Sequence, residues 1–367
     1  MALLLTALAC RKAYLPPEIA SAGSLLVVEG VIVPGADSTF IRLSHTVKLS
    51  EKTSSQPETG ATVTVEGNGA TYNLTEIAGG TYASAGLSLD AAKTYRLKIH
   101  TAGGQDYLSD EMEVKITPPI DSISYKIKGD TLDFYSAAHD PSGKTQYYRW
   151  DYQENWRFNA AFFSEFKVQG DSIVERTFPQ DDIYTCYTSS KSSTILLNTS
   201  VRTSQDIITQ NPIAQIPAGS EKISIRYSML LRQYALSKEA YAFWENLKKN
   251  TEQLGSIFDA LPSEISGNIH NVANPQTPVI GYVSISTIAS KRVYVDRSEM
   301  PFTPAWRTVY AFEGCSIRIP EGNEIQESVI QGNGLNIPIK ANNYTSRQCA
   351  DCTIRGTLLK PAFWTDN

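Results

Sequence analysis

The chain has 367 residues, which is enough for about two or three domains with substantial apolar cores. Its 38 acidic and 33 basic residues give a formal net charge of −5, which argues against nucleic acid as a partner because nucleic-acid-binding proteins need a basic face. After the N-terminal residues, no stretch approaches the roughly 20 apolar residues of a transmembrane helix. The 19 tyrosines, together with many threonine, valine and isoleucine residues, favour strands.

The N-terminal residues have the pattern of a bacterial lipoprotein signal. A short apolar run ends at Ala9, directly before Cys10, as in secretory signals that are followed by a lipid-modified cysteine. We expect residues 1–9 to be the remnant of a longer signal peptide and Cys10 to be the lipid attachment site. Residues 10–23, which contain Pro16-Pro17, are then a stiff tether to a membrane surface. The alternative is an unmodified cysteine at an apolar terminus.

Four cysteines remain once Cys10 carries lipid: Cys186, Cys315, Cys349 and Cys352. An even number in an oxidising compartment predicts two disulfides, whose pairing the sequence leaves open. The close pair Cys349 and Cys352 has two other interpretations. A redox motif is disfavoured because no βαβ pattern surrounds the pair, and a zinc site with Cys315 or His270 is disfavoured because a second close-spaced pair of ligands is missing.

Residues 24–117 are predicted to form a β-sandwich domain. Strands are expected over 25–33, 40–44, 61–65, 71–74, 94–99 and 107–109, with another beginning at residue 79. They recur about every 8–12 residues between glycine turns and without a helix pattern, which is typical of an immunoglobulin-like or transthyretin-like sandwich. Val63 and Val65 are expected to point inward, and residues 51–60 to form a polar loop. Pro118-Pro119 marks the domain boundary.

Residues 118–367 are predicted to form a larger β-rich domain, with strands over 120–127, 132–134, 147–152 and 221–231. Tyr148, Trp150 and Tyr152 share one face of their strand and are expected to be core, with a sugar-binding platform as the alternative. The polar face of the strand over 221–231 is expected to contact water. It carries Lys222, Ser224, Arg226 and Ser228.

One amphipathic helix is predicted near residues 238–254 of this domain. Ser237 is a suitable N-cap, Glu239 lies in the first turn and Gly255 follows the last periodic residue. Its apolar stripe is expected to pack on the sheet of the second domain, with a partner-binding face as the alternative. Residues 279–286 and 291–295 are then expected to pair as a hairpin, and the tail ending in 360–364 to close a sheet edge.

Short motifs in a fixed order run through most of the chain after Cys10. They are Leu26-Val27-Val28-Glu29-Gly30, Tyr148-Arg149-Trp150, Gly255-Ser256-Ile257-Phe258-Asp259, Pro262, Gly267-Asn268-Ile269, Asn274-Pro275, Gly281-Tyr282, Cys349 and Cys352, Arg355-Gly356 and Pro361-Ala362-Phe363-Trp364. In these motifs the chain resembles a Bacteroidota lipoprotein family described only as domain of unknown function 4249. The resemblance implies an outer-membrane lipoprotein, often encoded beside a TonB-dependent receptor, and implies no catalytic residues. Arg11-Lys12 differ from the acidic surface-export signals of that phylum, so the periplasmic and surface faces both stay open.

The sequence contains no recognised catalytic motif. It lacks a Gly-x-Ser-x-Gly elbow, a His-Glu-x-x-His pair and a phosphate-binding glycine loop. Asp181-Asp182 indicates either a calcium site or a solvated loop. A glycosidase carboxylate pair stays open, because its members can come from anywhere in the sequence. Isolated histidines are more often surface or hydrogen-bonded residues than ligands, and those of this chain are His45, His100, His139 and His270.

Two functions from different classes follow. The first is an outer-membrane lipoprotein that acts as a non-enzymatic binding or accessory subunit with a TonB-dependent receptor. The second is a surface carbohydrate-binding or adhesive protein with aromatic platforms such as Trp156 or Trp306, which requires at least one of these indoles to be exposed. We predict no catalytic residue, metal ligand or cofactor, and the sequence does not identify the ligand-binding residues.

Overall fold

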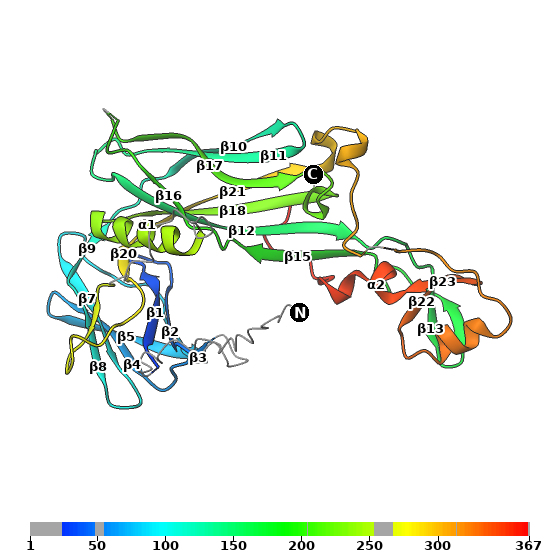
Figure 1. Cartoon of the computed structure of the whole chain (residues 1–367), viewed down its shortest axis with the longest axis horizontal. Coiled ribbons are helices and arrows are strands. Elements are labelled where there is room, and N and C mark those ends of the chain that lie inside the picture. Colours follow the sequence, from blue (N-terminus) through cyan, green and yellow to red (C-terminus); the bar gives the residue numbers. More distant parts are fainter. Residues whose placement is uncertain (1–23, 48–54, 204, 253–266, 313, 366–367) are drawn as a thin grey trace, which may run out of the picture.

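The computed structural model describes residues 24–47, 55–203, 205–252, 267–312 and 314–365, and the molecule is elongated along one axis (Figure 1). Several predicted features lie outside the described residues: the signal remnant 1–9, Cys10, the tether over 10–23, the start of the polar loop 51–60 and the motifs between Gly255 and Pro262. The described chain is mainly β, as predicted.

The strands and helices follow one another along the chain in three groups. The first group is β1 (Leu26–Ile32), β2 (Thr39–His45), β3 (Gln56–Pro57), β4 (Thr62–Gly67), β5 (Ala70–Ala78), β6 (Thr81–Ser84), β7 (Thr94–His100), β8 (Asp106–Ser109) and β9 (Met112–Lys115). The second is β10 (Ile120–Lys128), β11 (Thr131–His139), β12 (Tyr147–Asn159), β13 (Phe166–Gln169), β14 (Ser172–Glu175), β15 (Thr185–Lys191), β16 (Leu196–Thr199), β17 (Ile207–Pro217) and β18 (Arg226–Ala235). The third is α1 (Lys238–Glu252), β19 (Ile269–Asn271), β20 (Ser284–Ser286), β21 (Ile288–Asp296), β22 (Asn336–Lys340), β23 (Asn343–Ser346) and α2 (Arg347–Ala350). Short helical turns lie at Glu221–Ile223, Arg297–Glu299, Pro304–Trp306, Gln326–Ile330 and Cys352–Ile354.

The first domain is built on a sheet whose pairing path closes on itself, because its last strand pairs with β7. The strand order is β19-β8-β7-β4-β5-β6-β2-β1-β20-β9, β9 also pairs with β7, and β3 lies beside β2. Alternation along the strands points one face inward, and Val63 and Val65 of β4 are both buried, as predicted. The immunoglobulin-like or transthyretin-like detail stays a prediction.

A late segment of the chain completes this sheet. β19 pairs antiparallel with β8, and β20 lies parallel to and between β1 and β9. The predicted hairpin of 279–286 with 291–295 is therefore wrong, because β20 belongs to the first domain while β21 pairs with β18 of the second. Pairing of sequence neighbours is only the commonest arrangement of strands, and the predicted domain boundary at 117/118 does not include this returning segment.

Gly281 permits the close approach of the returning segment to β1. Its φ is +121°, and an added Cβ would lie 1.9 Å from the backbone oxygen of Val28. Beside it, the backbone nitrogen of Val28 donates a hydrogen bond to Ile280 (2.8 Å), and that of Ile280 donates to Leu26 (2.9 Å). A side chain at position 281 would separate these backbones, so glycine is required here.

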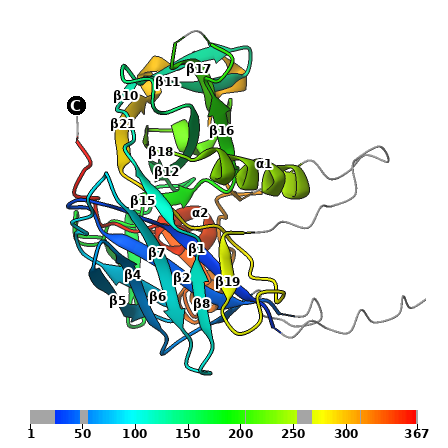
Figure 2. The same ribbon diagram turned by 90° about the vertical axis from the view of Figure 1, so that its left-hand side faces the viewer.

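The second domain packs two sheets face to face (Figures 1 and 2). One has the order β10-β11-β17, and the other has the order β15-β12-β18-β21 with β16 beside β12. Tyr148 and Trp150 of β12 are buried in the core between the sheets, and Tyr152 packs partly buried against the same core. The core interpretation of this aromatic face is confirmed.

The polar face predicted over 221–231 is only partly in contact with water, because Lys222 and Ser224 are half-buried in and beside a helical turn that precedes β18. Arg226 and Ser228 are buried on this face. Ser228 Oγ accepts a hydrogen bond from Arg292 Nη1 at 2.8 Å, and Arg292 Cζ lies 3.6 Å from the centre of the Phe363 ring. Arg292 and the C-terminal segment therefore cover the part of this face around Ser228, where the alternating pattern predicts contact with solvent.

The predicted helix, α1, lies at the junction of the two domains (Figure 2). Ser237 caps it, since the backbone nitrogen of Ala240 donates to Ser237 Oγ at 3.1 Å. Its apolar residues pack on the second domain, as predicted, with the Tyr241 ring 5.1 Å from that of Tyr147. They also reach the returning segment of the first domain, because the rings of Phe243 and Tyr282 are 5.3 Å apart. α1 therefore contacts both domains.

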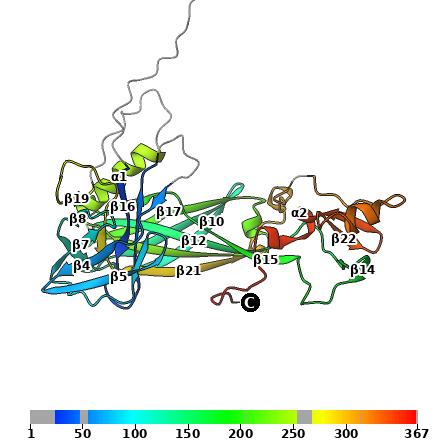
Figure 3. The same cartoon turned by 90° about the horizontal axis from the view of Figure 1, so that it is seen from below.

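A third unit lies at the far end of the molecule from the first domain (Figures 1 and 3). We call it the distal lobe and define it as residues 161–181 and 314–351. It contains the hairpins β13–β14 and β22–β23 and the short helix α2. The backbone nitrogen of Glu165 donates to the oxygen of Ile339 at 3.0 Å, which joins its two chain segments.

Candidate functional site

Two disulfides hold the distal lobe and its base. Cys315 is bonded to Cys349 within the lobe, and Cys186 of β15 is bonded to Cys352 at the lobe's base. The sequence predicted two disulfides and left their pairing open. Cys349 and Cys352 have different distant partners, so the redox and zinc interpretations of this close pair are wrong. Instead, one cross-link closes a loop within the lobe, and the other joins the lobe's base to β15 of the central sheet.

Polar side chains organise the interior of the lobe. Ser164 is 1% exposed, and its Oγ accepts a hydrogen bond from Arg176 Nε at 3.0 Å and lies 2.7 Å from the carbonyl oxygen of Pro338. Burial lowers the pKa of the Arg176 guanidinium. Lys167 Nζ lies 2.6 Å from Asp181 Oδ2, and this hydrogen bond lowers the pKa of the carboxyl group. The buried hydrogen bond of Ser164 to Pro338 therefore joins the two segments of the lobe, and the other two contacts hold the first segment together.

Asp181-Asp182, where the sequence left a calcium site and a solvated loop open, lies at the edge of the lobe. Besides Lys167, Asp181 Oδ2 accepts a hydrogen bond from the backbone nitrogen of Thr177 at 2.8 Å. Asp182 Oδ1 accepts one from the backbone nitrogen of Tyr184 at 2.8 Å. Both carboxylates hold the turn, and among the described residues no group of three or more His, Cys, Asp or Glu side chains could hold a metal ion.

Large apolar side chains are exposed on the lobe and on the chain beside it. We call this set the apolar end. Its most exposed lobe members are Ile319 (75%) and Leu335 (72%), and Leu359 (77%) belongs to the C-terminal segment at the lobe's base. Large apolar side chains that stay exposed are candidates for an interaction surface. The other members are Phe163, Val168, Phe178, Ile317, Ile354 and Leu358.

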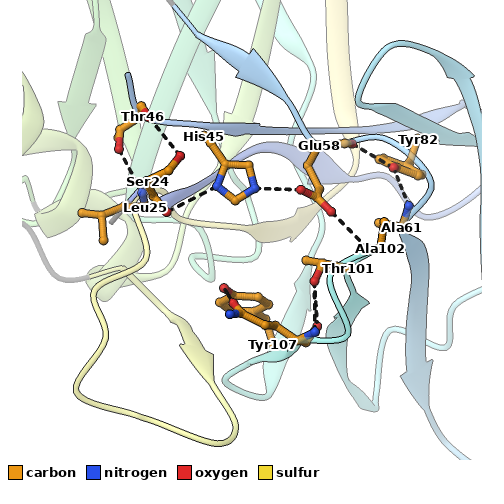
Figure 4. A network of polar contacts seen from close by, with 11 residues as sticks. Ser24, Leu25, His45, Thr46, Glu58, Ala61, Tyr82, Thr101, Ala102 and Tyr107 are labelled. Atoms are coloured by element: carbon orange, nitrogen blue, oxygen red, sulfur yellow. Dashed lines mark hydrogen bonds and ion pairs between the residues drawn. The ribbon is translucent and has the colours of Figure 1, made fainter. Parts of the chain in front are cut away.

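Figure 4 shows the polar network at the opposite end, where the described chain begins. The backbone nitrogen of Leu25 donates to Thr46 Oγ1 at 2.9 Å. His45 Nε2 lies 2.7 Å from Glu58 Oε2, and the hydroxyl of Tyr82 donates to the backbone oxygen of Glu58 at 2.9 Å. Burial raises the pKa of Tyr82, which keeps this donor protonated. The first described residues are thus tied into the first domain. No helix within the described ranges is long and apolar enough to cross a membrane.

Two grooves lie at the junction of the domains. The larger, of about 870 Å³, is bordered by α1, by residues 110–115 and by the returning segment at Tyr282. Its charges have both signs, and Lys115 Nζ lies 2.7 Å from Glu113 Oε2. The smaller, of about 560 Å³, is lined by arginine and lysine side chains of both domains.

Each of the four histidines pairs with one carboxylate. The pairs lie on separate parts of the two domains and do not come together as one site. They are His45–Glu58 (2.7 Å), His100–Asp106 (2.9 Å), His139–Asp121 (2.8 Å) and His270–Asp110 (3.1 Å).

The two indoles named as sugar platforms differ in exposure. Trp306 is 4% exposed and belongs to the core of the second domain. Trp156 is half-buried, its Nε1 donates to Glu221 Oε1 at 3.4 Å, and Lys222 Nζ lies 5.4 Å from its ring centre. Trp306 is therefore excluded as a sugar platform, because aromatic content does not distinguish a surface ring from a core ring. Trp156 is only partly buried, so the carbohydrate-binding alternative stays a prediction.

Comparison with known proteins identifies a family and no function. The family model described as "Domain of unknown function (DUF4249)" matches residues 12–292. No protein of curated function matches the sequence.

Solved structures show only distant similarity. One is the interferon gamma receptor alpha chain of chicken, with 11% identity, 59% of this chain and 91% of that chain covered, and a TM-score of 0.18. Another is a provisionally assigned carbohydrate-binding protein from Bacteroides uniformis, with 11% identity, 59% and 91% covered, and a TM-score of 0.16. A third is a chitinase from Bacillus thuringiensis, with 10% identity, 52% and 25% covered, and a TM-score of 0.15. At such scores these similarities carry no functional inference.

Proposed function

We propose that this chain, which belongs to the family described as domain of unknown function 4249 (DUF4249), is an outer-membrane lipoprotein that acts as a non-enzymatic binding or accessory subunit of a TonB-dependent receptor. Cys10 carries the lipid, and residues 10–23 form the tether. The receptor is the partner implied by the motifs that resemble this lipoprotein family.

The observation that carries the proposal is the apolar end on a cross-linked lobe. Ile319 and Leu335 are exposed on a unit held by two disulfides and by the buried hydrogen bonds of Ser164. A preorganised apolar surface loses little conformational freedom when a partner covers it, which favours association. A TonB-dependent receptor is a large, stable partner for such a surface.

The positions of the two ends support the same proposal. The chain enters the first domain at Ser24, while the distal lobe is at the other end of the long axis (Figure 1). A tether at one end leaves the other end free to reach a partner in the same membrane. The domain junction between them offers grooves for a ligand.

The test is affinity purification of the lipidated protein from its native outer membrane in mild detergent, followed by mass spectrometry. The unchanged protein is expected to bring down a TonB-dependent receptor in stoichiometric amount. The double variant Ile319→Asp/Leu335→Asp is expected to lower receptor recovery by about tenfold or more, because charges on a buried interface are unfavourable.

The matched control is Ile77→Asp, which places the same charge on an exposed side chain (59%) of the first domain. It is expected to retain the receptor, and all three proteins are expected to unfold at the same temperature because the changed side chains are exposed. Purification of the unchanged protein without any receptor contradicts the proposal, as does equal recovery with the double variant.

A further inference from the structure

The smaller groove at the domain junction has a positive charge excess in an acidic protein. It is lined by Glu29 and Arg42 from the first domain and by Arg149, Asp151, Lys191 and Arg232 from the second. Four cationic and two acidic side chains give a formal excess of two positive charges, whereas the whole chain has a net charge of −5. We call this feature the basic groove.

Arg149 is held in place by aromatic rings. Its Cζ lies 4.4 Å from the centre of the Tyr234 ring and 4.6 Å from that of Trp244, which is on α1. Its Nε is buried and has no hydrogen-bond partner among the described residues. The guanidinium is thus positioned by its faces and not by a hydrogen bond from Nε.

Asp151 orients the second guanidinium of the groove. Its Oδ1 accepts a hydrogen bond from Arg232 Nε at 2.8 Å, and its Oδ2 accepts one from the hydroxyl of Tyr234 at 2.8 Å. Arg149 Nη2 lies farther away, 3.9 Å from Asp151 Oδ2. Burial, followed by the charge of Asp151, raises the pKa of Tyr234, so the phenol remains a donor. The single carboxylate of Asp151 therefore lies beside the guanidinium groups of both Arg149 and Arg232, so one of their two positive charges is uncompensated.

The rim of the groove adds exposed groups of two kinds. Arg42 and Lys191 are exposed cations from different domains. Phe40 is 52% exposed and also lines the groove, which gives a ligand an apolar surface beside the charges. A volume of about 560 Å³ matches the space occupied by small-molecule ligands.

We propose that the basic groove binds a small oxyanion ligand, a molecule that carries a carboxylate or phosphate group, with Arg149 and Arg232 contacting the anion. Planar guanidinium groups fit the paired oxygens of both anions. Arg42 and Lys191 attract the ligand, and Phe40 contacts its uncharged part. Association with a receptor is not needed for this binding, so the proposal is independent of the proposed function.

The test is isothermal titration calorimetry of the full chain in detergent with three probes: inorganic phosphate, D-galacturonate and neutral D-galactose. Saturable binding of galacturonate alone identifies carboxylates as the class, binding of phosphate alone identifies phosphates, and binding of both supports their shared chemistry. The absence of saturable binding by either anion, or equal affinity for galactose, overturns the proposal.

Variants locate the site. Arg149→Lys keeps the charge but loses the planar donor pair, and it is expected to weaken anion binding by about tenfold or more. Lys191→Ala, at an exposed position where folding is not affected, is expected to weaken binding by about threefold. The control Lys340→Ala removes an exposed lysine from the distal lobe and is expected to leave affinity unchanged. Equal affinity of Lys191→Ala and Arg149→Lys with the unchanged protein also overturns the proposal.

Discussion

The first domain and the distal lobe, at the two ends of the molecule, are stabilised by different means. The first domain buries a large cluster of aliphatic and tyrosine side chains from most of its strands. The distal lobe has two short hairpins, few buried apolar residues, and two disulfides at its interior and base. A small unit cannot bury enough apolar area to be stable alone, so covalent cross-links replace a core. The same shortage leaves apolar side chains exposed on the lobe, where a partner can use them.

Of the changes that test this comparison, removal of the lobe's internal disulfide is expected to have the largest effect on stability. Cys315 and Cys349 are 34 residues apart, and a cross-link over such a loop contributes about 4 kcal/mol. The double variant Cys315→Ser/Cys349→Ser is expected to increase hydrogen exchange in β22 and β23 and to leave β1–β9 protected. Equal protection of β22 and β23 with and without the disulfide would show that the lobe does not depend on it.

Gly281→Ala is expected to destabilise the first domain instead. The added Cβ would meet the backbone oxygen of Val28, so a free-energy loss of about 3 kcal/mol or more is expected in urea unfolding. Gly69→Ala is the control, because Gly69 also has a positive φ (+73°) but nothing within 4 Å of its Cβ position. It is expected to cost about 1 kcal/mol. Similar losses for both variants would contradict the role assigned to close packing of the returning segment.

Ser164→Ala tests the polar part of the lobe. The variant removes the acceptor of the buried Arg176 Nε, and a loss of about 1–2 kcal/mol is expected. The loss is expected to appear as faster exchange of the lobe's amides, with the first domain unaffected. A variant with unchanged exchange would mean that water or another group replaces the hydroxyl.

The smallest effect is expected for the pH-dependent stability that arises from His139. Its hydrogen bond to Asp121 raises the pKa of His139 above the ordinary value of 6.5. A raised folded-state pKa means that the stabilisation is present below pH 6.5 and is lost as pH rises through the folded-state value. His139→Gln is therefore expected to reduce stability in mild acid and to change it little in alkaline solution, measured by urea unfolding at both pH values. A loss that is equal at both pH values would contradict this assignment.

Local signals made part of the fold predictable. Ser237 and the helical periodicity after it identified α1, and alternation around Tyr148 and Trp150 identified a core strand. Contacts between distant residues left no such signal. β20 lies between β1 and β9, and Cys186 pairs with Cys352 over a separation of 166 residues. Neither follows from a periodic pattern, because both depend on the folded path of the chain.

The candidate sites were less predictable than the fold. Alternation along β18 predicts a polar face in contact with water, and nothing in that strand's own sequence indicates that Arg292 and the C-terminal segment cover Ser228. The cations of the basic groove come from four strands of two domains. Their spacing in the sequence therefore does not indicate that they lie close together in the fold. The sequence signal that did exist was the motif Tyr148-Arg149-Trp150, in which a charged residue lies between two core aromatic residues.

Site-specific photo-crosslinking in the native outer membrane tests the central claim most directly. A photoreactive amino acid replaces Leu335 in the distal lobe or, as the control, Ile77 in the first domain; both side chains are exposed. The account predicts a covalent adduct with a TonB-dependent receptor from position 335 and none from position 77. Receptor adducts from position 77 alone, or the absence of a receptor adduct from either position, would contradict the assignment of the apolar end as the docking surface.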